Sequence, residues 1–127
     1  MAPLTPFAGA AKPLYEIKAN LFKALAHPAR IRVLEILCVQ DDPVAVSDLL
    51  AETGLEATLL SQHLAVLKRH QVVTAERTGN AVHYQVAHPL VAELLRIART
   101  FLADTLAANQ ERIDAMETLP SLARPDR

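Results

Sequence analysis

The chain has 127 residues, which is enough for one domain but leaves little room for a second. Because 51% of the residues are hydrophobic, the chain can bury a core, and disorder throughout is excluded. The net charge is −1, so any surface that binds a polyanion must be local. The single cysteine, Cys38, excludes an intrachain disulfide and a zinc site of the CxxC type.

The composition also bears on location. No apolar run approaches the roughly 18 residues of a membrane-spanning helix. The first residues, MAPLTPFAGAAKP, lack the basic segment of a secretory signal peptide. We therefore expect a cytoplasmic protein without a membrane partner. Its domain would cover 14–118, between a flexible arm at 1–13 that contains three prolines and a flexible tail at 119–127.

Apolar residues at helical spacing predict two helices after this arm. The first covers about 15–26, with Ile17, Leu21 and Leu25 on one face. The second begins at Pro28, which suits a first helical turn because its missing N–H would have no partner there, and it runs to about residue 39. The residues expected to face inward on it are Ile31, Leu34, Leu37 and Cys38.

Two short helices with a tight turn between them come next. The first covers 44–54 and ends at Gly54, where a left-handed backbone costs little, and the second covers 57–70. This pair matches a helix-turn-helix unit. Residues rich in β-branched side chains then predict strands near 72–77 and 82–87, joined by Gly79 and Asn80.

A long helix over 89–118 completes the pattern. The fold class is therefore mainly α with a small β-hairpin, in the order α-α-α-α-β-β-α of a winged helix-turn-helix domain. The segments LFKALAHPARIRVLEIL, VSDLLAETG, LSQHLAVLKRHQVV and RTGNAVHYQV resemble the ArsR/SmtB family of bacterial transcriptional regulators, over roughly 15–106. The resemblance implies a homodimeric repressor, and many members of that family release DNA when they bind a metal ion.

The helix at 57–70 carries polar side chains that suit contact with double-stranded DNA and, within 57–70, no carboxylate. We expect three roles for its polar residues and those of the hairpin tip: hydrogen bonds to base edges, contacts to phosphate, and contacts from the wing. The predicted DNA-binding residues are Thr58, Ser61, Gln62 and His63 for bases, Lys68 and Arg69 for phosphate, and Arg77 and Asn80 in the wing. An ordinary solvated helix face and a plain solvated turn are the alternatives.

Three other side chains modify this expectation. Arg30 and Arg32 either add DNA contacts or serve only for solubility. Glu56 stands where family members often have a serine, and its carboxylate suits a helix N-terminus but not an adjacent phosphate. Residues 54–87 contain three basic and two acidic side chains, so the net positive charge of this segment is modest.

The last helix has more apolar residues than one face of a small domain requires. We therefore expect a homodimer, which would place two recognition helices on two DNA half-sites, unless these residues only cover the monomer core. In the family the first and last helices form the dimer interface. The predicted interface residues are Leu21, Leu94, Ala98, Phe101, Leu102 and Leu106.

The metal sites known for the family are not complete in this sequence. Ala45 and Ser47 stand at the two cysteine positions of the arsenic and cadmium type, and neither is a ligand for a soft metal. At the four zinc-type positions, His88 and Asp104 stand at the outer two, and Leu90 and Phe101 replace the two histidines. We expect no cofactor and no metal, although His27, His83 or His88 leave a different site open, and the effector is unknown.

The sequence therefore favours a sequence-specific DNA-binding regulator, a repressor that binds a palindromic operator. The alternative is a winged-helix protein-interaction module without specific DNA readout. No nucleophile with a neighbouring base, no paired carboxylates and no Gly-rich phosphate loop are recognisable, so an enzyme is not expected. Cys38, at an inward position, is expected to be inert core, and a redox role is the alternative.

Overall fold

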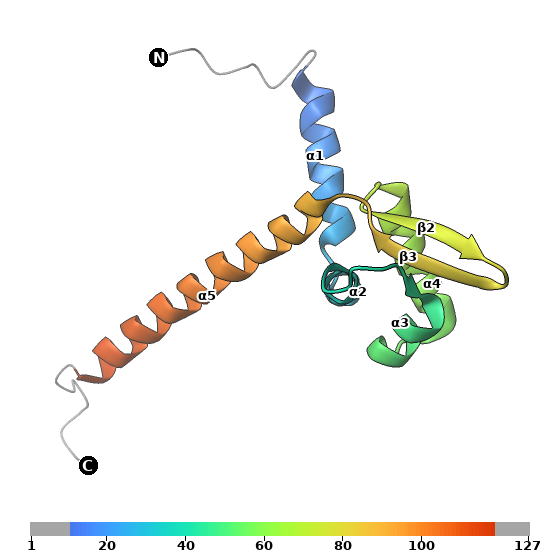
Figure 1. Cartoon of the computed structure of the whole chain (residues 1–127). Coiled ribbons are helices and arrows are strands. Elements are labelled where there is room, and N and C mark those ends of the chain that lie inside the picture. The colour runs from blue at the N-terminus through green and yellow to red at the C-terminus, as the bar shows by residue number, and fades with distance from the viewer. Residues whose placement is uncertain (1–10, 119–127) are drawn as a thin grey trace. The chain divides into compact units, whose positions relative to one another are not determined.

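The first two helices are joined by a short connection, and a histidine caps the second of them. The computed structural model describes residues 11–118, in which α1 covers Ala11–Leu25 and α2 covers Pro28–Cys38 (Figure 1). His27 caps α2, because its Nδ1 accepts a hydrogen bond of 3.1 Å from the N–H of Ala29. The predicted arm at 1–13 was too long, because α1 already begins at Ala11; residues 1–10 lie outside the described part.

The helix-turn-helix consists of α3 (Val46–Thr53) and α4 (Ala57–Arg69). The chain leaves α3 through Gly54, which has a left-handed φ of 67° and whose N–H donates to the carbonyl of Leu50 over 2.9 Å. This confirms Gly54 as the end of the helix. The start of α3 differs from the prediction, because Val44 and Ala45 form strand β1 instead of a helical turn. Their pairing with a neighbouring strand satisfies backbone groups that a first helical turn would leave free.

The sheet has three antiparallel strands in the order β1-β3-β2. Strands β2 (Val73–Thr78) and β3 (Ala81–Val86) form the predicted hairpin, within one residue of the expected bounds, and β1 adds a third strand that was not predicted. Gly79 takes a φ of 64° at the first position of the two-residue loop, where a tight hairpin turn requires a positive φ.

The core of residues 11–92 lies where α2, α3 and α4 meet the sheet. Leu34, Leu49, Leu60 and Leu67 have no exposed surface, and burial of such side chains contributes about 1.5–3 kcal/mol each. On α1 only the last turn is buried, and Ile17, which was predicted to share a face with Leu21 and Leu25, is 64% exposed. The buried hydrophobic residues are Ala24, Leu25, Val33, Leu34, Ile36, Leu37, Leu49, Leu60, Leu64, Leu67, Val72 and Val73.

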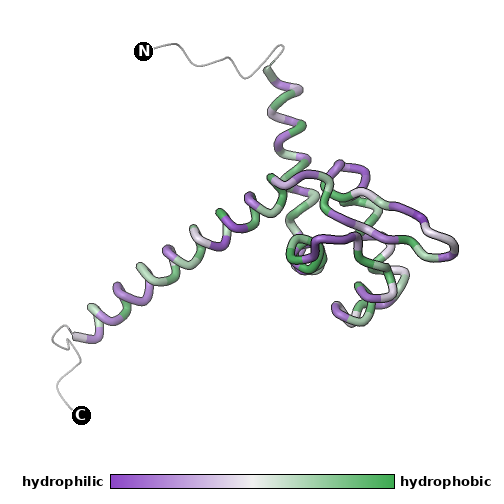
Figure 2. Tube along the Cα trace, in the orientation of Figure 1, coloured by the Kyte–Doolittle hydropathy of each residue, from purple (hydrophilic) through white to green (hydrophobic). Residues whose placement is uncertain are grey.

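The last helix, α5, covers Pro89–Thr118 as predicted, and from Glu93 onwards it forms a compact unit separate from the first. Hydrophobic and hydrophilic positions alternate along it (Figure 2), and none of its residues is buried. Within residues 11–118 no helix is both long enough and apolar enough to cross a membrane. The predicted tail at 119–127 lies outside the described residues.

Candidate nucleic-acid interface

Helix α4 separates its apolar and polar residues on two sides. Leu60, Leu64 and Leu67 are at most 2% exposed, and they anchor the helix in the core. The exposed side carries hydroxyl, amide and basic groups, and no acidic residue occurs between Ala57 and Arg69. The predicted contact residues on this exposed side are Thr58, Ser61, Gln62, Lys68 and Arg69.

His63 belongs to the buried side of α4, so the expectation that it faces DNA was wrong. Its exposed fraction is 4%. Its Nδ1 accepts a hydrogen bond of 3.1 Å from Nε of Arg30, which also donates from Nη1 to the carbonyl of Ala24 over 3.3 Å. The spacing already indicated this position, because His63 follows Leu60 by three residues and precedes Leu67 by four.

Arg30 therefore has a structural partner that the sequence did not reveal. The sequence indicated only a surface or phosphate-binding role, whereas the guanidinium joins α2 to α4 and to the last turn of α1. Arg32, two residues later, is exposed. The Arg30–His63 contact spans 33 residues of sequence, and no local pattern predicts such a pair.

The start of α4 is capped by Glu56. Its Oε1 accepts a hydrogen bond of 3.3 Å from the N–H of Thr58, and the carboxylate also suits the positive end of the helix dipole. Since Glu56 already occupies one of the free N–H groups, this helix end is poorly suited to a phosphate. The other end of the helix carries two basic residues, Lys68 and Arg69, in its last turn.

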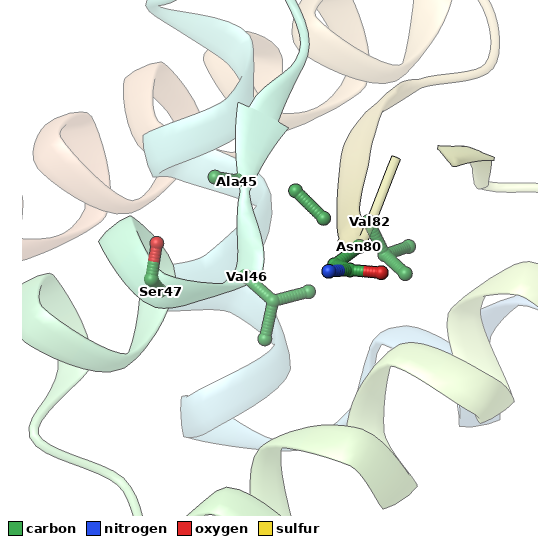
Figure 3. Close-up of a pocket in the computed structure, with 6 residues that line it drawn as sticks. Ala45, Val46, Ser47, Asn80 and Val82 are labelled. Atoms are coloured by element: carbon green, nitrogen blue, oxygen red, sulfur yellow. The ribbon is translucent and has the colours of Figure 1, made fainter. Parts of the chain in front are cut away.

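The hairpin tip is exposed and carries one basic side chain. Arg77 and Asn80 are both exposed, and Arg77 pairs across the hairpin with Val82. Beside the tip lies a pocket of about 400 Å³ between the β1–α3 junction and β3. In Figure 3 the side chain of Val46 points toward Asn80 and Val82, whereas the hydroxyl of Ser47 points away from them.

The residues considered above as possible metal ligands make other contacts in the structure. Ala45 pairs with His83 in the sheet, and Nδ1 of His88 accepts a hydrogen bond of 3.0 Å from the N–H of Leu90 at the start of α5. No group of three or more His, Cys, Asp or Glu side chains within residues 11–118 has the arrangement of a metal site. Burial, and secondly the carboxylate of Glu35, raises the pKa of the half-buried Cys38 thiol above its usual value, which disfavours the reactive thiolate.

The residues predicted for a dimer interface lie on α1 and α5. Leu21 of α1 is half-buried and, with Ile17 and Arg69, lines a shallow pocket of about 410 Å³. Leu94 of α5 is also half-buried. The other four predicted residues, Ala98, Phe101, Leu102 and Leu106, are exposed.

A helix-turn-helix held in a leucine core and followed by an antiparallel hairpin defines the winged-helix class of DNA-binding domains. Comparison with known proteins agrees. The family described as "Helix-turn-helix domain" matches residues 25–76. The chain is 50% identical over 109 residues to the HTH-type transcriptional regulator Rv0081 of Mycobacterium tuberculosis, covering 85% of this chain and 91% of that protein. This chain belongs to the ArsR/SmtB family of winged helix-turn-helix transcriptional regulators, and it is a DNA-binding regulator of transcription.

Solved structures and a further relative support the same assignment. The crystal structure of Mycobacterium tuberculosis Rv0081 matches with a TM-score of 0.70 and 51% identity, over 76% of this chain and 96% of that one. The homodimeric winged helix-turn-helix domain of Mb0332 from Mycobacterium bovis matches with a TM-score of 0.69 and 28% identity, over 84% and 94% of the two chains. A probable mercury resistance operon repressor of Streptomyces lividans is 33% identical over 90 residues, which is 71% of this chain and 70% of that protein.

Proposed function

We propose that this regulator is a dimeric repressor that binds a palindromic operator, with α4 in the major groove and the β2–β3 hairpin as the wing. The observation that carries the proposal is the division of α4. Its leucines are buried, whereas its exposed side presents hydroxyl, amide and basic groups without a carboxylate. Such a face can approach the DNA backbone and place polar groups against base edges.

Base readout is assigned to the first half of α4. Gln62 can form two hydrogen bonds with an adenine edge, Ser61 is a more permissive donor and acceptor, and the Thr58 methyl suits a thymine methyl group. Lys68 and Arg69, at the end of the helix, are assigned to phosphate. Arg77 and Asn80 at the wing tip are assigned to the flanking backbone or minor groove.

The dimer is proposed from the apolar residues that α1 and α5 leave exposed. On α1, Leu14 is 62% and Phe22 is 59% exposed; on α5, Phe101 is 67% and Leu106 is 66% exposed. Two copies can cover these residues, and a relative with this fold is homodimeric. A twofold dimer places two α4 helices on half-sites about one DNA turn apart, and the protein would act in the cytoplasm, where its operator lies.

The proposal is tested by selecting duplexes from a randomised pool with the full-length protein at about 150 mM salt. We expect an imperfect palindrome, bound at least about a thousandfold more tightly than random duplex. Gln62→Ala should relax the preference at one base position in each half-site by about 1–3 kcal/mol. Lys68→Ala should weaken all sequences alike and lower the slope of log K against log salt by roughly 0.9 for each phosphate that the variant no longer neutralises.

One alternative is favoured by a specific observation, the Glu56 cap at the start of α4. A winged-helix module that binds protein would tolerate this carboxylate, whereas a phosphate-binding helix end would not. Selection that enriches no sequence, together with equal binding of every duplex, would reject the repressor and leave this alternative. Glu56→Ser separates the two further, because it should strengthen DNA binding only if α4 lies against the DNA backbone.

A further inference from the structure

Three side chains form a cluster, hereafter the His–Arg cluster, between the start of α2 and the middle of α4: exposed His27, half-buried Arg30 and buried His63. The rings of His27 and His63 lie with centroids 4.4 Å apart at an interplanar angle of 51°. Nε of Arg30 donates to Nδ1 of His63 over 3.1 Å. Because His63 is on the buried side of α4, the cluster contacts the recognition helix without being part of the face proposed to meet DNA.

The hydrogen bond from Arg30 fixes the protonation state of His63. An arginine side chain has only donors, so Nδ1 of His63 must be the unprotonated acceptor. The proton of the neutral ring is then on Nε2, which is buried and has no hydrogen-bond partner among the described residues. Proton uptake at Nδ1 would leave two donors facing each other and would place a second cation beside Arg30.

The surroundings of His63 contain groups that oppose such a proton. Burial, then His27 and then Arg30, lowers the pKa of His63 below its usual value. His27 and Arg30 both lie at the start of α2. The last turn of α1 contributes the Ala24 carbonyl, which accepts from Arg30, and β2, which also packs on α4, adds no group to those that shift this pKa. Arg30 also disfavours a metal cation between the two imidazoles.

We propose that the Arg30–His63 hydrogen bond is a proton-sensitive clasp that positions the recognition helix, so that proton uptake by His63 weakens specific DNA binding. Arg30 and His63 are thus positioning residues that act through α4. When His63 is neutral, α4 is tied to α2 and, through Arg30, to α1. When His63 is charged, α4 loses this hydrogen bond at its centre. The exposed face of the same helix carries Ser61 and Gln62. The effect on DNA rests on the proposed function, whereas the clasp itself does not.

The clasp is tested first without DNA, by NMR titration of the full-length protein between about pH 8 and pH 5. We expect the His63 ring to titrate below the ordinary value of about 6.5, and the amide signals of α4 to shift with the same midpoint. In Arg30→Gln, which removes the positive charge beside His63 and supplies an amide that can pair with either protonation state, the midpoint should move upward. A His63 that titrates at its ordinary value while the α4 amides stay unchanged would overturn the proposal.

The second test measures the affinity of the selected duplex and of random duplex at about pH 7.5 and pH 5.5, at constant salt. For the wild type, we expect the ratio of specific to random affinity to fall at the lower pH. His63→Asn places a non-titrating acceptor near the position of Nδ1 and should abolish the fall.

His70→Asn is the matched control, since His70 also belongs to α4, at its C-terminal cap, and lies outside the His–Arg cluster. It should keep the wild-type fall. An equal fall in His63→Asn and the wild type would overturn the clasp. If His63→Asn does not fold, Arg30→Gln decides the question, because its amide can pair with either form of His63 and should remove the fall. A fall equal to that of the wild type would then overturn the clasp. If selection yields no specific duplex, the proposed function fails, and the NMR titration still decides whether the clasp exists.

Discussion

Helices α4 and α5 both carry regularly spaced leucines, but they place them in opposite surroundings. In α4, Leu60 and Leu67 have no exposed surface, whereas in α5 Leu102 is 55% and Leu106 is 66% exposed. Leu60 and Leu67 of α4 thus pack within the core, whereas Leu102 and Leu106 of α5 are exposed among the described residues. Similar apolar spacing in two helices therefore forms an internal core in one, and in the other leaves the exposed residues that we propose for association.

The largest expected effect comes from truncating a leucine on each helix. Leu60→Ala should lower the free energy of unfolding by about 2.7–5 kcal/mol, because it leaves a cavity in a packed core. Leu102→Ala is the matched substitution on α5, and its effect on urea unfolding should depend on protein concentration. The contrast between α4 and α5 would be contradicted if Leu60→Ala lowers the free energy of unfolding by less than about 1 kcal/mol, or if both variants unfold alike at all protein concentrations.

A charge on α5 tests the proposed association directly. Phe101→Glu places a carboxylate among the exposed apolar residues, so it should raise the dimer dissociation constant by more than about tenfold. Light scattering over a range of concentrations measures this, with Thr100→Glu, at an exposed neutral residue of the same helix, as the charge-matched control. If the wild type is a monomer at micromolar concentration, the exposed residues of α5 have another role.

The same contrast explains which parts of the fold the sequence could predict. The helix periods, the Gly54 stop and the Gly79–Asn80 turn are local signals, and the structure confirms them. Strand β1 was missed because two residues carry no period, and their strand character depends on pairing with Tyr84 and His83 far along the chain. In α1, Ile17 fits a helical stripe, but no spacing reveals whether a stripe meets the core or solvent.

The candidate site shows the same limit at the level of single residues. Seven of the eight predicted DNA-binding side chains are exposed, and their roles in binding stay predictions. His63 was misplaced because a polar residue type was given more weight than its spacing within the Leu60–Leu67 stripe. Its burial requires a distant partner, and Arg30, 33 residues earlier, was not recognisable as that partner from local sequence.

The buried histidine of α4 gives the folded state a pH-dependent stability. Since the pKa of His63 is lowered in the folded state, the unfolded chain binds the proton more readily. The contribution to stability is therefore complete above the unfolded value of about 6.5 and is lost as pH falls from there through the folded pKa, with a slope of at most about 1.4 kcal/mol per pH unit. Urea unfolding of the wild type and His63→Asn at several pH values measures it, and parallel curves would contradict this assignment.

The smallest expected effect lies at the C-terminal end of α4. Gln71 adopts a left-handed φ of 61°, while its N–H donates to the carbonyl of Lys68 over 3.0 Å and the N–H of Val72 donates to that of Leu67 over 2.9 Å. These are the two hydrogen bonds of a Schellman motif, in which glycine is the usual residue at this position. Because Gln71 is exposed and its backbone is strained there, Gln71→Gly should raise the free energy of unfolding by up to about 1 kcal/mol.

Gly54→Ala at the end of α3 is the reverse substitution. It places a side chain at a φ of 67° where no atom lies within 4 Å of the added Cβ, so any loss of stability comes from backbone strain and not from a steric contact. We expect that variant to lose about as much as Gln71→Gly gains, measured by urea unfolding under identical conditions. A loss of stability in Gln71→Gly would instead mean that the side chain of Gln71, which lines a pocket together with Ile17 and Leu21, contributes more to stability than its backbone conformation costs.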